Sequence, residues 1–291
     1  MQEYTMSKLI QLRQRIKVIE TIQKITHAMR LISMSVHSHL KRDESALTTY
    51  IQSLEKTFAK LQLHAENWSH PIIRPQKTVN QNTLIIIVGS QKGLCGSFNL
   101  NLFRLCDNYI KNSPTSRQEN SHFIGVGQKA VDFLKDRKVQ NIEQTYTKFT
   151  PQRLPEIAQK ITDTILHAKQ PYSSVIILSN EFKSFFNQKP RIYTLIPCVS
   201  QTTEGNSISD DILWDQSPEI LLDELAHQYI EGHIHFVLFE SLLAEHAARF
   251  VSMDTSTRNA DSLLDIAKLQ YNKLRQAKIT KELTELVGSF R

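Results

Sequence analysis

The residues best suited to chemistry form a glycine cluster near the end of the first third of the chain. Gly89, Gly93 and Gly96 follow an apolar run, and backbone amides at the start of a helix can hold a phosphate. A phosphate loop needs four residues between its glycines and then Lys-Ser or Lys-Thr, whereas Lys92 here precedes Gly93. The spacing therefore favours a tight strand-to-helix turn over a phosphate site.

A second glycine pattern invites a dinucleotide interpretation. Gly125, Gly127 and Ala130 match the fingerprint that follows the first strand of a nucleotide-binding fold. That fold also needs an acidic residue about 20 positions further on, at the end of another strand. Glu143 comes early and stands in a polar run, so the pattern favours a structural turn and no cofactor site.

Histidine and cysteine spacings offer no metal site and no nucleophile. His37 with His39, and His233 with His235, are two positions apart, which on a helix points them about 200° apart. No HExxH motif occurs, and Cys95 has no neighbouring base in the sequence to activate it. We therefore predict no catalytic residue, no cofactor and no metal ligand.

Cysteine usage and hydropathy limit the compartment. Cys95, Cys106 and Cys198 are odd in number and contain no CxxC pair, which is typical of reduced thiols in a cytosolic protein. No run approaches the roughly 20 apolar residues of a membrane span, and the N-terminus does not resemble a signal peptide. The expectation is a protein that is soluble, or peripheral to a membrane at most.

The positive charge is concentrated at the N-terminus. The chain has a formal net charge of +6, and residues 1–42 hold eight Lys or Arg against two Glu. A basic helix of this kind favours an anionic partner, which leaves nucleic acid, lipid headgroups and an acidic protein surface all open.

Two very long helices are expected at the ends of the chain. The first proline is Pro71 and the first glycine is Gly89, while Gly232 is the one breaker between Pro218 and Val287. Apolar residues recur mostly every three or four positions in both segments, as in a coiled-coil seam. Since one helix enters the middle segment and the other leaves it, the two must be antiparallel if they pair.

The middle segment has the alternating pattern of an α/β sheet with crossover helices. We expect strands at 84–88, 123–126, 175–179 and 191–196, with helices near 98–112, 127–137 and 152–169. The predicted fold class is α/β, with a Rossmann-like domain inserted between the two helices of an antiparallel coiled coil. The predicted division is 1–70 for the first helix, 75–215 for a globular foot and 218–288 for the second helix.

Three segments resemble the gamma subunit of F-type ATP synthases. Residues 23–29 read Gln-Lys-Ile-Thr-His-Ala-Met and 92–99 read Lys-Gly-Leu-Cys-Gly-Ser-Phe-Asn. Residues 245–249, Glu-His-Ala-Ala-Arg, are followed at the family's spacing by Met253-Asp254 and by a similar run at 271–288. Glu245 and Arg249 also have the spacing of an ion pair within a helix. The resemblance covers nearly the whole chain in order.

The resemblance implies a central rotor shaft without bond chemistry of its own. The coiled coil would lie inside the catalytic ring of alpha and beta subunits, and the foot on the membrane c-ring beside the epsilon subunit. It would couple ion flow to ATP synthesis or hydrolysis and regulate ATPase activity. The implied location is the cytoplasmic face of the bacterial inner membrane, with membrane contact only through the complex.

The resemblance also implies contacts with the catalytic ring. Arg275 and Gln276 would hydrogen-bond the polar catch loop of one beta subunit, and Lys24 and Met29 would face its acidic segment. The residues matching the coupling-sensitive upper shaft are Thr280, Glu282 and Glu285. The alternative for all seven is a solvated helix surface.

Several positions depart from the family pattern. Residues 31–36 are followed by His37 where the family runs toward a Lys, Gln91 and Lys92 replace an acidic-basic pair, and Ser97 replaces a glycine. The tail, 288–291, is also altered. These departures indicate a divergent branch of the family.

Two other classes of function were weighed. A basic coiled coil that binds nucleic acid would use the N-terminal helix, yet no aromatic residue is interleaved with its basic residues between Lys8 and Arg42 and no groove-reading motif is present. A dinucleotide-binding enzyme with helical arms would rest on the weak glycine pattern at Gly125. We expect no nucleic-acid partner.

Overall fold

A computed structural model describes most of the chain. The described residues are 2–65, 68, 70, 82–112, 121–168, 170–198 and 216–289. The polar run 200–211, expected as a loop, and the last two residues of the tail lie outside them.

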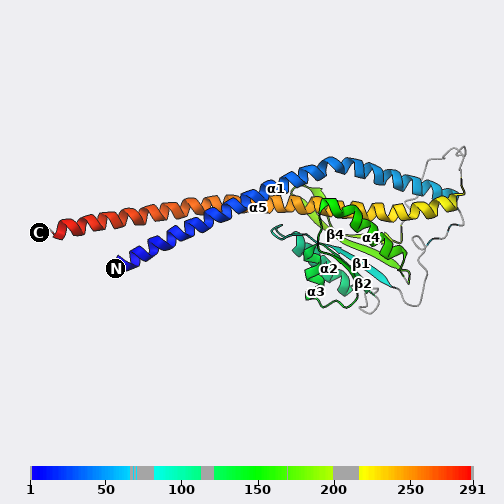
Figure 1. The fold of residues 1–291 in the computed structure, drawn as a ribbon, viewed down its shortest axis with the longest axis horizontal. Coiled ribbons are helices and arrows are strands. Elements are labelled where there is room, and N and C mark those ends of the chain that lie inside the picture. Colours follow the sequence, from blue (N-terminus) through cyan, green and yellow to red (C-terminus); the bar gives the residue numbers. More distant parts are fainter. Residues whose placement is uncertain are drawn as a thin grey trace. The chain divides into compact units, whose positions relative to one another are not determined.

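The two long helices are present as expected (Figure 1). Helix α1 spans Gln2–His64 and α5 spans Pro218–Ser289. The absence of Pro and Gly explains the unbroken length of α1, because these two residues are the strongest helix breakers. Pro218 opens α5, where its missing N–H costs nothing, and the Leu221 N–H donates to the Ser217 carbonyl at 3.2 Å.

The chain forms two compact units. One, which we call the paired-helix unit, comprises Met1–Ser35 and Arg249–Arg291, and the other, the α/β unit, comprises Val36–Ala248. Each contains part of both long helices.

In the paired-helix unit the helices are antiparallel, as predicted. Polar side chains bridge them in pairs whose numbers rise along α1 and fall along α5: Glu20 with Lys268 at 3.6 Å, Gln23 with Asp261 at 2.5 Å, Thr26 with Thr257 at 2.9 Å, and Arg30 with Asp254 at 2.7 Å. Between these pairs lies a small apolar cluster of Ile16, Ile19, Ala260, Leu264 and Ala267. The small side chains of Ala260 and Ala267 on α5 face the larger Ile16 and Ile19 of α1 in this cluster.

The α/β unit is built on one sheet of five strands. They are β1 Thr83–Val88, β2 Ser121–Val126, β3 Ile142–Tyr146, β4 Ser174–Ser184 and β5 Asn187–Ile196. Their order is β3-β2-β1-β4-β5, and all neighbouring pairs are parallel except β4 with β5. Strand β3 was not predicted, because it is an edge strand with no buried residue and its sequence has no apolar run.

Helices cover both faces of the sheet. Strand β1 alternates, with Ile85 and Ile87 facing α2 (Phe98–Asn112) and α3 (Gln128–Asp136), while Leu84, Ile86 and Val88 face α4 (Leu154–Leu166) and α5. This alternation follows from the two-residue period of a strand. A short 3-10 turn, Pro151–Arg153, leads into α4. Part of α5 is therefore a layer of the α/β unit.

Within the described part of the chain, no helix combines the length and apolar character that a membrane span requires.

Candidate functional site

The glycine pattern at Gly125–Gly127 serves a close approach of backbone to backbone. Gly127 has φ +86°, and a Cβ there would lie 2.1 Å from the carbonyl oxygen of Gly89. The Gly127 N–H donates to the Tyr146 carbonyl at 2.8 Å, and the Lys129 N–H at the start of α3 donates to the Ser90 carbonyl at 3.1 Å. The Lys129 N–H at the start of α3, which in a nucleotide-binding fold could face a phosphate, is thus already bonded to the protein backbone.

The sheet order places a crevice between β1 and β4. The chain leaves β1 toward β2 and β3 on one side and returns to β4 on the other, and this is where doubly wound sheets bind nucleotides, beyond the carboxyl ends of the strands. Here the space is filled by the protein itself. The residues packed there are nearly inaccessible to solvent: Ser90, Cys95, Phe98, Asn180 and Glu245.

The cluster around Ser90 accounts for the 92–99 motif. Asn99 accepts from the Ser90 N–H at 3.1 Å and donates to the Ser90 hydroxyl at 2.8 Å, and it also lies 3.2 Å from the Cys95 sulfur. The side-chain amide of Asn180 reaches the Phe98 carbonyl at 3.4 Å. These bonds hold the segment between β1 and α2 together and attach the start of α2 to Asn180 within β4.

Glu245 of α5 closes the crevice. Its Oε2 accepts from the backbone N–H of Gln91 at 3.1 Å, and the carboxylate-bearing residue is 1% exposed. The Gln91 side chain in turn accepts from the Phe149 N–H at 2.5 Å. A buried carboxylate therefore occupies a position where an anionic ligand would lie in a nucleotide-binding sheet. The sequence analysis singled out Glu245 for the family resemblance of residues 245–249 and for its spacing to Arg249, but it did not predict the contact with Gln91.

A second acidic residue, Glu240, lies one and a half turns earlier on α5. Burial is the main cause that raises its pKa, to about 7, with the nearby Glu181 adding to the effect, while a bond from the Phe182 N–H opposes it. Glu181 is itself paired with Lys183 at 2.7 Å and Arg191 at 3.4 Å on the β4–β5 hairpin. Glu240 thus links α5 to β4.

His233 is enclosed where α1, α5 and β5 meet. The Tyr193 hydroxyl lies 2.7 Å from Nδ1, the Tyr229 ring lies 4.3 Å away, and Glu55 Oε1 is 3.6 Å from Nε2. Burial lowers the pKa of His233 to about 4. The ring is therefore neutral near pH 7, and its Nδ1 shares a hydrogen bond with the Tyr193 hydroxyl.

His37 shows what one family departure does. Its Nδ1 lies 3.3 Å from the Leu243 carbonyl, and its ring packs edge-on against Phe185 at 4.9 Å. Burial lowers the His37 pKa. A neutral imidazole here joins α1 to the tip of the β4–β5 hairpin, where a longer cationic side chain would not be buried without a partner.

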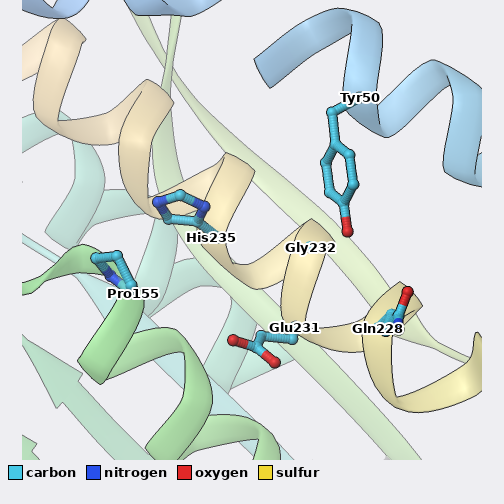
Figure 2. Close-up of a pocket in the computed structure, with 6 residues that line it drawn as sticks. All are labelled: Tyr50, Pro155, Gln228, Glu231, Gly232 and His235. Carbon is cyan, nitrogen blue, oxygen red and sulfur yellow. The ribbon is translucent and has the colours of Figure 1, made fainter. Parts of the chain in front are cut away.

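A pocket of about 170 Å³ opens between α1, α4 and α5 within the α/β unit. Figure 2 shows its lining: Tyr50, Pro155, Gln228, Glu231, Gly232 and His235. Ligand pockets usually have volumes of roughly 300 Å³ or more, so this one is small for a cofactor. No group of three or more His, Cys, Asp or Glu suited to a metal occurs among the described residues.

The cysteines are free thiols. Burial raises the pKa of both Cys106 and Cys198 to about 12. Since the thiolate is the reactive form, neither has the character of a nucleophile.

The residues predicted to contact the catalytic ring all lie in the paired-helix unit. Met29 is half-buried, and the exposed members are Lys24, Arg275, Gln276, Thr280, Glu282 and Glu285. Glu282 pairs with Lys278 at 3.5 Å and Glu285 with Lys281 at 3.7 Å, both along α5.

The last part of α5 has an unusual surface. Beyond Ala267 no residue whose burial is described is buried, although large apolar side chains continue along the helix. The most exposed are Leu269, Ile279, Leu283, Leu286 and Val287, with 48–72% of their surface accessible. An apolar helix surface of this kind marks an interaction site.

Comparisons with known proteins agree with this arrangement. The family model described as ATP synthase matches residues 8–291. The ATP synthase gamma chain of Geobacter metallireducens is 30% identical, and the match covers 97% of this chain and 98% of that one. The chain belongs to the ATP synthase gamma-chain family. The gamma chain of Bdellovibrio bacteriovorus is likewise 30% identical, with 97% and 98% covered.

Solved structures from the family have the same fold. A chain from the central stalk and c-ring of the Tetrahymena thermophila mitochondrial ATP synthase superposes with a TM-score of 0.56 at 17% identity, covering 79% of this chain and 98% of that one. A chain of the Euglena gracilis mitochondrial enzyme gives 0.55 at 18% identity, covering 91% and 94%. The predicted fold class and family are confirmed, and nothing in the comparisons supports nucleic-acid binding or a dinucleotide enzyme.

Proposed function

We propose that this chain is the central rotor shaft of an F-type ATP synthase and couples ion flow to ATP synthesis or hydrolysis. The observation that carries the proposal is the match to curated gamma chains over 97% of this chain, together with the ATP synthase family model over residues 8–291. The fold agrees with it, because the end helices are antiparallel. As part of the proposal, the chain regulates ATPase activity and contributes no catalytic group.

The exposed end of α5 supports a contact with the catalytic ring. Apolar residues such as Leu283 and Val287 leave water when a partner covers them, at about 25 cal/mol per Å². Arg275 and Gln276 lie on the same helix and are assigned to the catch loop of a beta subunit. Lys24, Met29, Thr280, Glu282 and Glu285 complete the proposed contacts with alpha and beta subunits.

Coupling requires that the shaft contact each catalytic subunit differently. A partner shifts a conformational equilibrium only by as much as its contacts favour one state. The two helices present unlike side chains around the seam, so rotation changes the contacts of every catalytic site in turn. Ion flow supplies about 2.3 kcal/mol per charge per 100 mV.

The remaining assignments follow the same proposal. The α/β unit docks on the membrane c-ring beside the epsilon subunit, at the cytoplasmic face of the bacterial inner membrane, and the chain meets the membrane only through the complex. The division into helix 1–70, foot 75–215 and helix 218–288 remains part of this proposal.

The test is assembly and activity. The chain is co-expressed with its alpha and beta subunits, the complex is purified, and ATPase activity is measured with and without this chain. A stoichiometric complex whose hydrolysis depends on the chain supports the rotor function. A well-folded chain that fails to join the ring contradicts it.

A further inference from the structure

A side chain of α5 contacts the segment after β1, at the place where the strand order reverses between β1 and β4. This contact bears on how the shaft is held by the α/β unit. Gln91 lies three residues beyond the end of β1, and its N–H donates to Glu245 of α5 at 3.1 Å. A shaft must keep a fixed register on the domain that turns it. The bond joins the two parts of the α/β unit whose register matters, the sheet and the helix that runs on into the paired-helix unit.

The apolar contacts between α5 and the sheet resist separation more than they fix register. Directional contacts are made by His233 with Tyr193 at 2.7 Å, by Glu240 with the Phe182 N–H, and by Glu245 with the Gln91 N–H at 3.1 Å. Ile230, Ile234 and Leu238 are at most 1% exposed and pack in the main apolar cluster. Burial of apolar surface is non-directional, so such an interface opposes removal of the helix with little preference for one rotation about its axis. A hydrogen bond to a carboxylate acts over a narrow range of distance and angle.

The Gln91 turn carries this register to further elements. Its side chain accepts from the Phe149 N–H at 2.5 Å, in the segment before α4, and the preceding Ser90 is held by Asn99 of α2. The pair Gln91–Glu245 therefore connects α5 with the segment after β1, with α2 and with the segment before α4.

We propose that Glu245 is a positioning residue for rotary coupling, because its bond to the Gln91 amide locks α5 in register on the α/β sheet. The inference rests on the proposed rotor function and adds to it the residue that transmits torque between shaft and foot. Glu245 touches no nucleotide and takes no part in catalysis.

The experiment compares Glu245→Gln with the wild type in the complete ATP synthase reconstituted into vesicles. ATP hydrolysis and ATP-driven ion pumping are measured in the same vesicles, and hydrogen exchange is measured on the full-length chain. The Gln91 amide is expected to exchange about tenfold faster, since a hydrogen bond to a charged group shifts an opening equilibrium by that factor or more. Ions pumped per ATP are expected to fall while hydrolysis continues and the melting temperature of the chain is retained.

The matched control is Glu231→Gln, on the same helix. Its carboxylate lies 3.7 Å from His227 one turn away, and its side chain is 35% exposed. This variant is expected to pump like the wild type. Glu245→Asp serves as the second variant, because it keeps the charge but shortens the reach to Gln91; it is expected to pump fewer ions per ATP as well.

Three results overturn the proposal. An unchanged ratio of pumping to hydrolysis in Glu245→Gln removes the coupling role, and unchanged exchange at Gln91 removes the bond as its cause. Loss of folding in both Glu245 variants assigns the residue to folding alone. Wild-type vesicles are measured first: if their ATP hydrolysis drives no pumping, the rotor function itself fails, before any variant is compared.

Discussion

Acidification should destabilise the α/β unit through His233. The ring is buried at 2% exposure, and burial lowers its pKa from 6.5 to about 4. A group whose folded pKa lies below its unfolded pKa contributes stability that is fully present above the unfolded value and is lost as the pH falls through the folded one. For His233 the loss begins below pH 6.5 and continues to about pH 4.

The size of the effect follows from the two pKa values. Between pH 7 and pH 5 the unfolded ring takes up a proton that the folded ring still refuses, which lowers the free energy of unfolding by about 2 kcal/mol. For a unit of this size that corresponds to about 4–8 °C in melting temperature. Protonation makes both ring nitrogens donors, so the Tyr193 hydroxyl, 2.7 Å from Nδ1, would then have to accept the hydrogen bond.

The assay is urea unfolding followed by circular dichroism at pH 7 and pH 5, on the wild type and on His233→Gln. Other groups titrate in this range. The informative quantity is therefore the free energy of unfolding lost between pH 7 and pH 5, compared between the wild type and His233→Gln. The Gln variant should lose about 2 kcal/mol less than the wild type on acidification. His39→Gln, which removes an exposed imidazole of α1, is the control and should behave as the wild type does. Equal losses in the wild type and in His233→Gln would refute the reasoning.

Three other predictions follow from neighbouring features. The pKa of Glu240 is raised to about 7, so its contribution to folding stability is present at low pH and is lost as the pH rises through that value. The free energy of unfolding of Glu240→Gln should therefore rise by about 1 kcal/mol relative to the wild type between pH 5 and pH 8, after allowance for partial exposure. A difference between the two proteins that does not change with pH in urea titrations would contradict this. Gly127→Ala should lower the free energy of unfolding by about 2 kcal/mol or more, because φ is +86° and the added Cβ would lie 2.1 Å from a carbonyl oxygen. Gly93→Ala is the control, because a Cβ at position 93 would have no heavy atom within 4 Å. Equal stability of the two variants would show the strain argument to be wrong. Replacing Arg275 and Gln276 with Ala should weaken coupled ATPase activity by removing polar contacts with a beta subunit, while leaving the circular dichroism of the chain unchanged since both side chains are exposed; unchanged hydrolysis and pumping in the reconstituted complex would remove the catch assignment.

The sequence predicted the layout of the fold because its strongest signals are local. Helix α1 could be recognised because its 63 residues contain no Pro or Gly, and α5 because Gly232 is the one breaker between Pro218 and Val287. Strands β1, β2 and β4 could be recognised from apolar runs. Strand β3 has no such run: it is an edge strand whose residues are half-buried on one face and exposed on the other, and none is buried. Its position became evident only from pairing with β2.

The contacts inside the α/β unit were harder to predict, because they join residues far apart in the chain. Glu245 and Gln91 are 154 positions apart, and only the sheet order brings the end of β1 to α5. Similarly, the spacing of His233 and His235 excludes a shared metal, and the structure places the buried His233 ring 2.7 Å from the Tyr193 hydroxyl. The spacing of the two histidines excluded a shared metal site, but it carried no information about β5, the strand that supplies Tyr193.

The placement of α5 in a layer of the sheet also limits how this protein can be divided. Residues 83–196 contain every strand of the described part of the chain, yet Ile230, Ile234 and Leu238 of α5 fill the core on one side of the sheet. A fragment cut at the apparent ends of the α/β segment would expose that apolar face to water and aggregate. A gene fusion or truncation that is meant to isolate the foot therefore has to include residues 218–248, because this part of α5 belongs to the core of the α/β unit.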